Sequence, residues 1–400
     1  MTTDEGNRLF LWSATAALGA HALLLLSTDG VHGGGDLKPH LRLIQLMAED
    51  PALRSVYAPA YHVLGGLTHP LLSLSAYAEW FAWCSIAALI LGFRAFQRAA
   101  GLPDVAAALF AWSPYHFALT TCLPKVEAAG YALTLLGLAL LLRKRHAAVA
   151  LCLTAAFCVH TAAALLLGLA GGVLALIERD RKGLLALAAG TALAAPLPLA
   201  HVAAGCSWPQ ALLFSQHDYL RAAPRLDNLA AWDRILVLAN PIALVAAVVG
   251  ARAFWSRSRT AAGVSGLLAF LYLNELWLAP FGARTTLDLL RGLTVLSIPL
   301  AAAGGFAFAR DSRIAIAAVA GSAVVALAAT LFVVPQSCVS KPIDLVEVGT
   351  LRVDRCQFRW RRAQPRSGHE AAPLGRGAEL AQIASDRVQV GPFEARSSAQ

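Results

Sequence analysis

The sequence has few charged residues. Asp, Glu, Lys and Arg make up 14% of its 400 residues, whereas an average soluble protein has roughly 25%. The hydrophobic fraction is 58% and the mean hydropathy is +0.59. Such a chain has too little polar surface to cover a water-soluble globule. The composition excludes a soluble enzyme, a secreted disulfide scaffold and a disordered protein, and it predicts a multi-pass membrane protein.

The sequence also lacks metal-binding and repeat patterns. Its 7 cysteines form no CxxC pair and no Cys/His ligand spacing, which argues against a structural zinc site. No internal repeat, heptad array or low-complexity tract is visible. Residues 1–8 are too polar for the front of a signal peptide, and no clear cleavage site follows. We therefore expect the first apolar run to be retained as a helix.

Long apolar runs fill most of the chain. A bilayer core about 30 Å thick needs about 20 apolar residues per helix. This length predicts spans at 9–28, 77–93, 103–119, 126–142, 183–203, 235–251, 261–281, 288–309 and 313–334. Residues 146–177 are too long for one upright helix, and we expect two helices that meet at His160. The expected fold class is all-α, a polytopic transmembrane helical bundle of about eleven spans.

Basic residues in short loops orient this bundle, because such loops favour the cytoplasmic side. The clusters are Arg94 and Arg98; Arg143-Lys144-Arg145; Arg179, Arg181 and Lys182; Arg252, Arg257 and Arg259; and Arg310 and Arg313. All five fall on one side only if residues 146–177 cross twice. The N-terminus is then cytoplasmic and the C-terminus extracytoplasmic, in the cell or inner membrane. The net charge of +9 reflects this topology, so no nucleic-acid partner is expected.

The first outer loop, residues 29–76, is rich in polar and flexible residues. Gly33-Gly34-Gly35 relaxes the backbone directly before Asp36, an acid close to the expected membrane surface. Residues 40–47 form an amphipathic stretch suited to lying in the interface. Residues 57–75 are apolar but interrupted by Pro and Gly, which indicates a re-entrant or surface-lying segment.

Further polar side chains fall on the same outer side. Lys125 and Glu127 begin the fourth span, His160 marks the apex of the broken pair, Glu275 lies inside a span, and Arg284 follows it. Charged groups in spans usually face a cavity or a partner.

Each of these residues also has an ordinary interpretation. Asp36 suits a solvated loop acid, Lys125 and Glu127 suit an exposed pair at a helix end, and His160 suits a hydrogen bond within a kink. The remaining histidines of the apolar segments are interpreted as packing or interface residues: His21, His62, His69, His116 and His201. The functional interpretation rests on the side of the membrane that the polar groups share.

The polar tail begins after the last span. Residues 344–349 and 350–360 alternate apolar and polar side chains, as paired strands do, with Gly349-Thr350 as the turn. We expect an exoplasmic strand pair over 335–362 after the membrane domain of 1–334, and a largely disordered tail over 363–400. Cys338 and Cys356 lie in this outer segment, where oxidation persists. We expect them to form a disulfide; two unpaired thiols are the alternative.

These motifs together resemble those of the C-type membrane glycosyltransferase superfamily (GT-C). The resemblance rests on Gly33-Gly34-Gly35-Asp36-Leu37-Lys38-Pro39-His40, Tyr57-Ala58-Pro59, Lys125-Val126-Glu127 and the short arm that ends at His160. In architecture it covers about residues 9–334. The paired acidic element of some members is absent, since Asp36 stands alone. The resemblance therefore implies no fixed cofactor, and it leaves room for Mg²⁺ or Mn²⁺.

The resemblance implies a sugar donor on a polyprenyl phosphate and a lipid, glycan or protein acceptor. Displacing an anomeric phosphate needs a base near the acceptor hydroxyl and cations for the departing phosphate. The expected catalytic residues are Asp36 and Glu127, and the expected substrate contacts are Lys125, His160, Arg284, Glu275 and His40. A polytopic transporter or lipid flippase is the alternative, because it also needs broken helices and intramembrane acids. A membrane-bound acyltransferase is a third.

Overall fold

The computed structural model describes residues 2–27, 40–41, 44–45, 59–121, 126–203, 232–278, 292–332, 351–353 and 358–360. The helices of the first half are α1 (Thr3–Ser27), α3 (Pro59–Thr68), α4 (Leu74–Ala99), α5 (Asp104–Ala111), α6 (Pro114–Thr121), α7 (Glu127–Leu142), α8 (His146–Val159) and α9 (Thr161–Ile177). Those of the second half are α10 (Arg181–Ala194), α11 (Pro196–Ala203), α13 (Trp232–Leu238), α14 (Pro241–Arg257), α15 (Arg259–Tyr272), α16 (Asn274–Leu278), α17 (Leu293–Phe308) and α18 (Ser312–Phe332).

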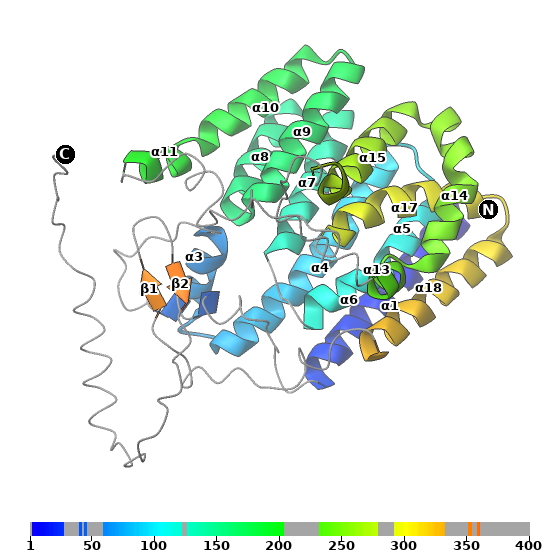
Figure 1. The fold of residues 1–400 in the computed structure, drawn as a ribbon, viewed down its shortest axis with the longest axis horizontal. Coiled ribbons are helices and arrows are strands. Elements are labelled where there is room, and N and C mark those ends of the chain that lie inside the picture. Colours follow the sequence, from blue (N-terminus) through cyan, green and yellow to red (C-terminus); the bar gives the residue numbers. More distant parts are fainter. Residues whose placement is uncertain are drawn as a thin grey trace.

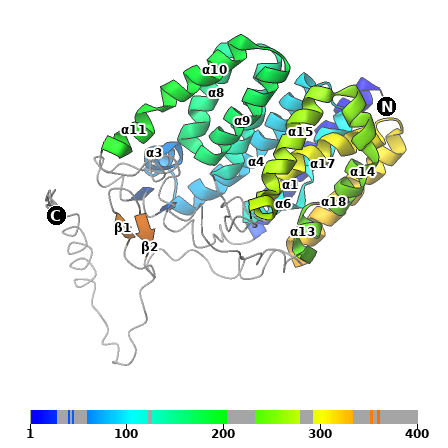
Figure 2. The same cartoon turned by 45° about the horizontal axis from the view of Figure 1, so that its top comes forward.

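The helices pack as one bundle with two groups. In Figures 1 and 2, α8, α9 and α10 lie side by side, and α14, α15 and α17 form a second group. Helix α4 packs on α7 beside the first group, α5 packs on α17 in the second, and α1 packs on α5. Helices α1, α4 and α5 therefore join the two groups.

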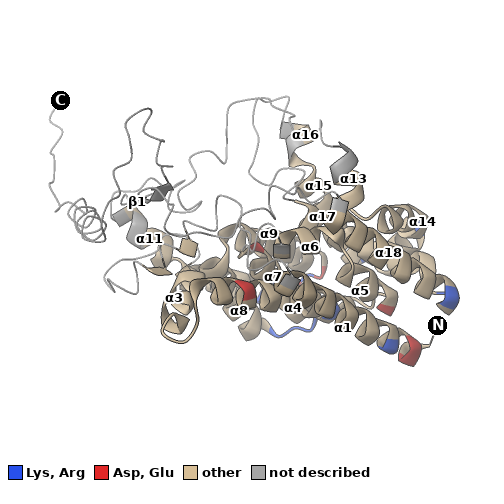
Figure 3. Cartoon of the chain, turned by 90° about the horizontal axis from the view of Figure 1, so that it is seen from below, with Lys and Arg blue, Asp and Glu red and all other residues tan. Residues whose placement is uncertain are grey.

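Four helices of the described chain are long and apolar enough to cross a membrane. They cover Thr3–Leu26, Leu74–Ala99, Arg181–Leu199 and Ser312–Leu331. Most residues of the helices are uncharged, and the charged ones lie mainly near helix ends (Figure 3). Large apolar side chains are exposed on the outside: Trp12 is 76% exposed, Leu26 78% and Val248 74%. Hydrocarbon solvates such a surface better than water does.

Several predicted spans are two helices rather than one. The span predicted at 103–119 is broken at Trp112-Ser113, and α6 begins at Pro114. A proline lacks the backbone N–H that a continuous helix needs and is tolerated in the first turn, so it marks a restart. Pro196 likewise opens α11 within the segment predicted as 183–203, but there the helical path continues, and Arg181–Leu199 as a whole is long enough to span.

A further break separates α13 from α14, within the span predicted at 235–251. Asn240 has a φ of 64°, a left-handed conformation that Asn tolerates better than most residues. Its side chain accepts a hydrogen bond from the backbone N–H of Ala243, and Pro241 opens the new helix. The segment predicted at 261–281 is likewise divided, at Leu273, into α15 and α16. The division predicted at His160 is confirmed, since α8 ends at Val159 and α9 begins at Thr161.

Tight helix contacts depend on glycine. A Cβ atom at Gly92 on α4 would lie 2.8 Å from the carbonyl oxygen of Ala132 on α7. A Cβ atom at Gly250 on α14 would collide with the carbonyl oxygen of Ala303 on α17. Small residues let helix backbones approach closely where apolar burial alone does not drive association. These two contacts fix the pairs α4–α7 and α14–α17.

A buried polar network joins the start of α1, the end of α4 and the start of α5. Arg94 donates hydrogen bonds to Asp104 and Gln97, each at 2.5 Å, and also to Asn7. Its side chain is 6% exposed, and its guanidinium lies over the Phe10 ring at 4.6 Å. A buried charge is tolerated only when it is paired and hydrogen-bonded. The network therefore holds these three helices in one arrangement.

A second polar cluster joins the connections α7–α8 and α9–α10. Asp180 accepts a hydrogen bond from the backbone N–H of Gly183 at 3.0 Å and thereby caps α10. Its other oxygen lies 3.0 Å from Nε2 of His146 and 3.2 Å from Nζ of Lys144. Burial acts to raise the pKa of Asp180, but the bonds from His146 and Gly183 and the charge of Lys144 outweigh it. The pKa falls to about 2.

The described part of the tail holds two short strands, β1 (Leu351–Val353) and β2 (Phe358–Trp360). They pair antiparallel, with Arg352 opposite Arg359. Both strands lie within residues 350–360, which were predicted as a single strand, and the predicted turn at Gly349-Thr350 lies outside the described residues. Residues 344–349, Cys338 and Cys356 lie outside the described residues.

Replacing Asp180 tests the role of this cap. Asp180→Ala removes both the cap and the charged partner, and loss of a helix cap costs about 0.5–2 kcal/mol in the free energy of unfolding. Asp180→Asn retains a good cap and removes only the charge, so its loss is smaller. Thermal unfolding in detergent measures both, and equal losses for the two variants would contradict the capping role.

The same comparison predicts a pH dependence. A carboxylate whose pKa is about 2 in the folded chain, against an ordinary value of 3.8, stabilises the fold fully above about pH 4. This stabilisation is lost as the pH falls through 2, because the carboxylate is then protonated in both states. The difference between wild type and Asp180→Asn therefore shrinks over that window.

Candidate functional site

Of the predicted site residues, Glu127, His160 and His40 have described side chains. Glu275 belongs to α16, where only its backbone is described. The others lie outside the described residues: Asp36, Lys125 and Arg284.

Glu127 is the first residue of α7. Its Oε2 atom is buried and has no hydrogen-bond partner within the described part of the chain. A buried polar group without a partner costs about 1–3 kcal/mol. The helix dipole favours an acid at this position, but it does not replace a donor. Glu127 therefore presents an acceptor that a substrate hydroxyl, a water molecule or a cation can satisfy.

His160 separates α8 from α9 in an extended conformation, with φ −159° and ψ 106°. It is 5% exposed. Its Nδ1 accepts a hydrogen bond from the backbone N–H of Ala163 at 3.3 Å and so caps α9. An accepting Nδ1 assigns the proton of the neutral ring to Nε2. His160 is thus built into the helix break as a hydrogen-bond donor.

Helix α7 brings Glu127 and His160 to the same side. A Cβ atom at Gly130 would lie only 2.7 Å from Cβ of His160, and the Tyr131 ring meets the His160 ring edge-on at 6.0 Å. Residues three and four apart on a helix share one face. Glu127 therefore lies one turn before the two residues that contact His160.

His40 lies against helix α3. Its Nδ1 is 2.7 Å from Nε2 of His62, which is fully buried. The Tyr61 ring meets both imidazoles edge-on, at 5.9 Å from His40 and 5.6 Å from His62. The Tyr77 hydroxyl on α4 donates to the carbonyl oxygen of Tyr61 at 2.6 Å. This hydrogen bond from α4 therefore holds the backbone next to His62 in place.

One apolar cluster connects these segments. It contains Leu41, Tyr61 and Val126, and Val159 packs against it. Each of these four residues is the direct neighbour in sequence of His40, His62, Glu127 or His160. The structure therefore brings together four segments that are separated in the sequence. We call this region, with His40, His62, Glu127 and His160, the candidate site.

His62 is the member that the sequence interpretation missed. The sequence interpretation places it with the packing or interface histidines of the apolar segments. One sequence feature could have indicated its role: His40 and His62 lie in the same outer loop, residues 29–76. Its partner is 22 residues away, and only the packing of α3 decides that the two rings meet.

Two other histidines are buried in the bundle, away from this cluster. His21 on α1 and His116 on α6 are both fully buried. Nδ1 of His21 lies 2.9 Å from the Thr120 hydroxyl, and its ring stacks on Phe117 with centroids 3.8 Å apart. These contacts join α1 to α6.

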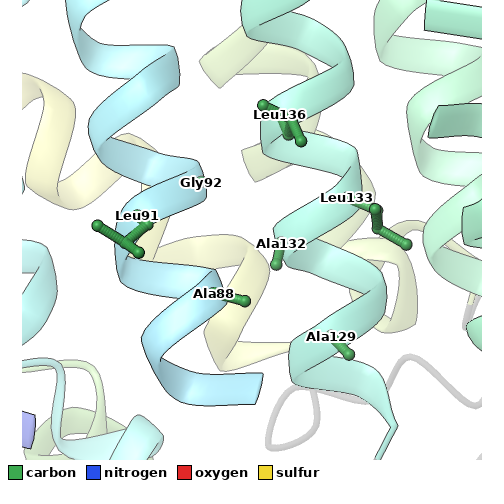
Figure 4. Close-up of a pocket in the computed structure, with 7 residues that line it drawn as sticks. All are labelled: Ala88, Leu91, Gly92, Ala129, Ala132, Leu133 and Leu136. Atoms are coloured by element: carbon green, nitrogen blue, oxygen red, sulfur yellow. The ribbon is translucent and has the colours of Figure 1, made fainter. Parts of the chain in front are cut away.

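A hollow of about 450 Å³ lies between α4 and α7 (Figure 4). Its lining is apolar: Ala88, Leu91, Gly92, Ala129, Ala132, Leu133 and Leu136. At 3.6 residues per turn, Ala129 and Leu136 point about 180–200° away from Glu127 around α7. The hollow therefore opens on the opposite side of α7 from the carboxylate, and its apolar lining offers no group for chemistry.

No cluster of three or more His, Cys, Asp or Glu side chains suited to a metal ion occurs among the residues that the structure describes. Asp36, the acid on which the expectation of Mg²⁺ or Mn²⁺ centred, lies outside them. The described candidate site thus offers imidazoles and one carboxylate, a set suited to proton transfer and hydrogen bonding.

The contact between Gly130 and His160 predicts a mutational effect. In Gly130→Ala the new Cβ would lie 2.7 Å from Cβ of His160 and 2.8 Å from Cβ of Ala163. Both neighbours are attached directly to backbone, so α7 must move away from α9, at a cost of about 1–3 kcal/mol. Gly168→Ala is the control, because no heavy atom lies within 4 Å of its new Cβ. A melting temperature lowered equally in both variants would contradict the close packing.

Comparison of the chain with protein-family models, with curated proteins and with solved structures gave no match.

Proposed function

We propose that this chain is a membrane glycosyltransferase. It transfers a sugar from a polyprenyl-phosphate donor to a lipid, glycan or protein acceptor at the extracytoplasmic face. The observation that supports this most is the meeting of Glu127, His160 and the His40 segment around one cluster, with a carboxylate oxygen left without a described partner. Acids and imidazoles at one membrane face suit proton transfer there.

The proposed reaction is a displacement at the anomeric carbon. The acceptor oxygen forms a bond to that carbon, the bond to the phosphate oxygen breaks, and the acceptor hydroxyl loses its proton. Asp36 is the proposed base, with Glu127 as the second carboxylate. Lys125 and Arg284 stabilise the departing phosphate by charge. His160 contributes its Nε2–H as a hydrogen-bond donor to the substrate. Glu275 and His40 are proposed as further substrate contacts.

The proposed topology has eleven spans with a cytoplasmic N-terminus. This topology is supported by contacts between the helix-connecting loops that carry the basic clusters. Asp180 pairs with Lys144, the Thr260 hydroxyl donates to Glu178 at 2.8 Å, and the Ser258 hydroxyl donates to the carbonyl oxygen of Ala100 at 3.1 Å. These connections lie at one end of the bundle only if the chain returns to that end after residues 146–177. Two crossings, by α8 and α9, satisfy this.

A transporter or lipid flippase is the competing function. Transporters typically bind substrate near the bilayer midplane between repeated halves. The candidate site instead lies at helix ends: Glu127 begins α7, and His160 stands between the end of α8 and the start of α9. This placement favours chemistry at the membrane face.

The topology predicts opposite sides for two positions. A single cysteine placed at residue 180 and another at residue 340, each in a cysteine-free background, are labelled in intact cells with a membrane-impermeant maleimide. We expect labelling at 340 alone, and labelling at both positions after the membrane is opened. The model with eleven spans fails if both react in intact cells.

The activity is tested in liposomes that hold purified protein, a labelled polyprenyl-phosphate sugar and candidate acceptors. We expect transfer by the wild type, and a fall of roughly 10²–10⁴ in rate for Asp36→Asn, because a general base contributes about that much. Melting temperature in detergent should stay near that of the wild type, since loop substitutions are usually worth under about 0.5 kcal/mol.

The outcomes of this assay separate the alternatives. Movement of the labelled lipid across the membrane without transfer would indicate a flippase. Transfer by Asp36→Asn at the rate of the wild type would place the base elsewhere, with Glu127→Gln as the next variant to measure.

A further inference from the structure

The His40–His62 contact has an unusual geometry. The facing nitrogens are 2.7 Å apart and the ring centroids are 5.0 Å apart. The two separations differ by 2.3 Å, about twice the distance from the centre of an imidazole ring to its nitrogen. The two centroids and the two nitrogens therefore lie nearly on one line, and the ring planes differ by only 23°. The nitrogen lone-pair directions point at each other.

This geometry suits one shared proton and does not suit a metal ion. Two imidazoles on one metal have their lone pairs converging on a point about 2.0–2.1 Å from each nitrogen, which is off the line between them. Two neutral or singly protonated rings place one hydrogen on that line, donated by one nitrogen and accepted by the other. If each facing nitrogen carried a proton, the two N–H groups would repel each other. The contact therefore limits the pair to one proton between the rings.

The pair also connects two environments. His62 is fully buried, whereas His40 is half-buried. A proton that arrives at Nε2 of His40 can be balanced by a shift of the shared proton from Nδ1 of His40 to Nε2 of His62. The positive charge then passes to the buried ring without any ring rotation. Proton uptake at the accessible ring and charge on the buried ring are thus coupled by one hydrogen bond.

The described surroundings contain few other ionisable groups. On its own helix the pair meets Tyr61, whose phenol has its pKa raised by burial and is neutral at ordinary pH. Helix α3 packs on α8 and α4, and the Tyr77 hydroxyl of α4 reaches the carbonyl oxygen of Tyr61. Helix α7 and the α8–α9 break bring Glu127 and His160 next to Val126 and Val159 of the same cluster. Glu127 is thus the carboxylate that adjoins this cluster among the described residues.

We propose that His40 and His62 act as a proton-sharing dyad that takes up the proton released by sugar transfer. The proposal rests on the glycosyltransferase function above. For each sugar transferred, the acceptor hydroxyl loses its proton to the base, and the base passes that proton on to Nε2 of His40. The shared proton then moves toward His62, and the dyad returns the extra proton to water. His40 is the ring at the site. His62 is a positioning residue, which holds the His40 ring and shares its charge.

The test compares His62→Gln with His69→Gln. A glutamine amide keeps a donor and an acceptor near the position of Nε2 but does not titrate. His69 lies just past the end of α3 and serves as a matched control in the same segment. In the liposome assay we expect kcat to fall about tenfold or more in His62→Gln, with the KM for the donor changed less than about threefold. The acid limb of the kcat profile against pH should move, and His69→Gln should match the wild type.

A second measurement does not depend on activity. In detergent-solubilised protein labelled with ¹⁵N-histidine, a coupled pair titrates as a unit, so the ring signals of His40 and His62 should share one midpoint. The spectra of His40→Gln and His62→Gln each lack the signals of one ring and so assign them. Separate midpoints for the two rings, or an unchanged kcat and pH profile in His62→Gln, would overturn the dyad. A wild type that transfers no sugar while the rings share a midpoint would instead refute the glycosyltransferase function alone.

Discussion

Hydrogen bonds at one end of the bundle determine how the helices meet at the other. Arg94 ties the start of α1, the end of α4 and the start of α5 together, and Asp180 ties the connections on either side of α8 and α9. Helices are stiff, and the close contact at Gly92 fixes α4 against α7 along their length. With one end fixed in this way, the position of Glu127 at the other end of α7 is no longer free.

The two ends of the bundle use polar groups differently. At the Arg94 and Asp180 end, acids and bases are paired, and they stabilise the arrangement of the helices. In the candidate site, Glu127 has a buried oxygen without a described partner, and His40 and His62 compete for one proton. Buried polar groups that lack a hydrogen-bond partner, or that share one proton, lower the stability of the fold. A protein retains them where a substrate or a proton supplies the missing interaction. A buried atom without a described partner does not by itself mark the candidate site, since Nε of Arg94 and both ring nitrogens of His116 are of the same kind. The shared proton of His40 and His62 is what distinguishes the candidate site.

Local sequence signals predicted many helix limits. The extended break at His160 follows from the length of the apolar run. The breaks at Trp112-Ser113 and Asn240 were missed because a hydropathy window averages over them. In the tail, the described strands β1 and β2 pair within residues predicted as one strand, because alternation gives the face of a strand but not the point at which the chain reverses.

The sequence by itself determined the class of the molecule: few charges, long apolar runs and basic clusters between them predict helices in a membrane, and four described helices have the length and composition to span one. It also singled out Glu127, His160 and His40 as polar groups in apolar surroundings. Only the tertiary structure decided that these residues meet, and that His62 belongs with them. Periodicity reports the environment of each residue along its own helix, whereas the contact of His40 with His62, and of Gly130 with His160, depends on the packing of helices distant in the sequence.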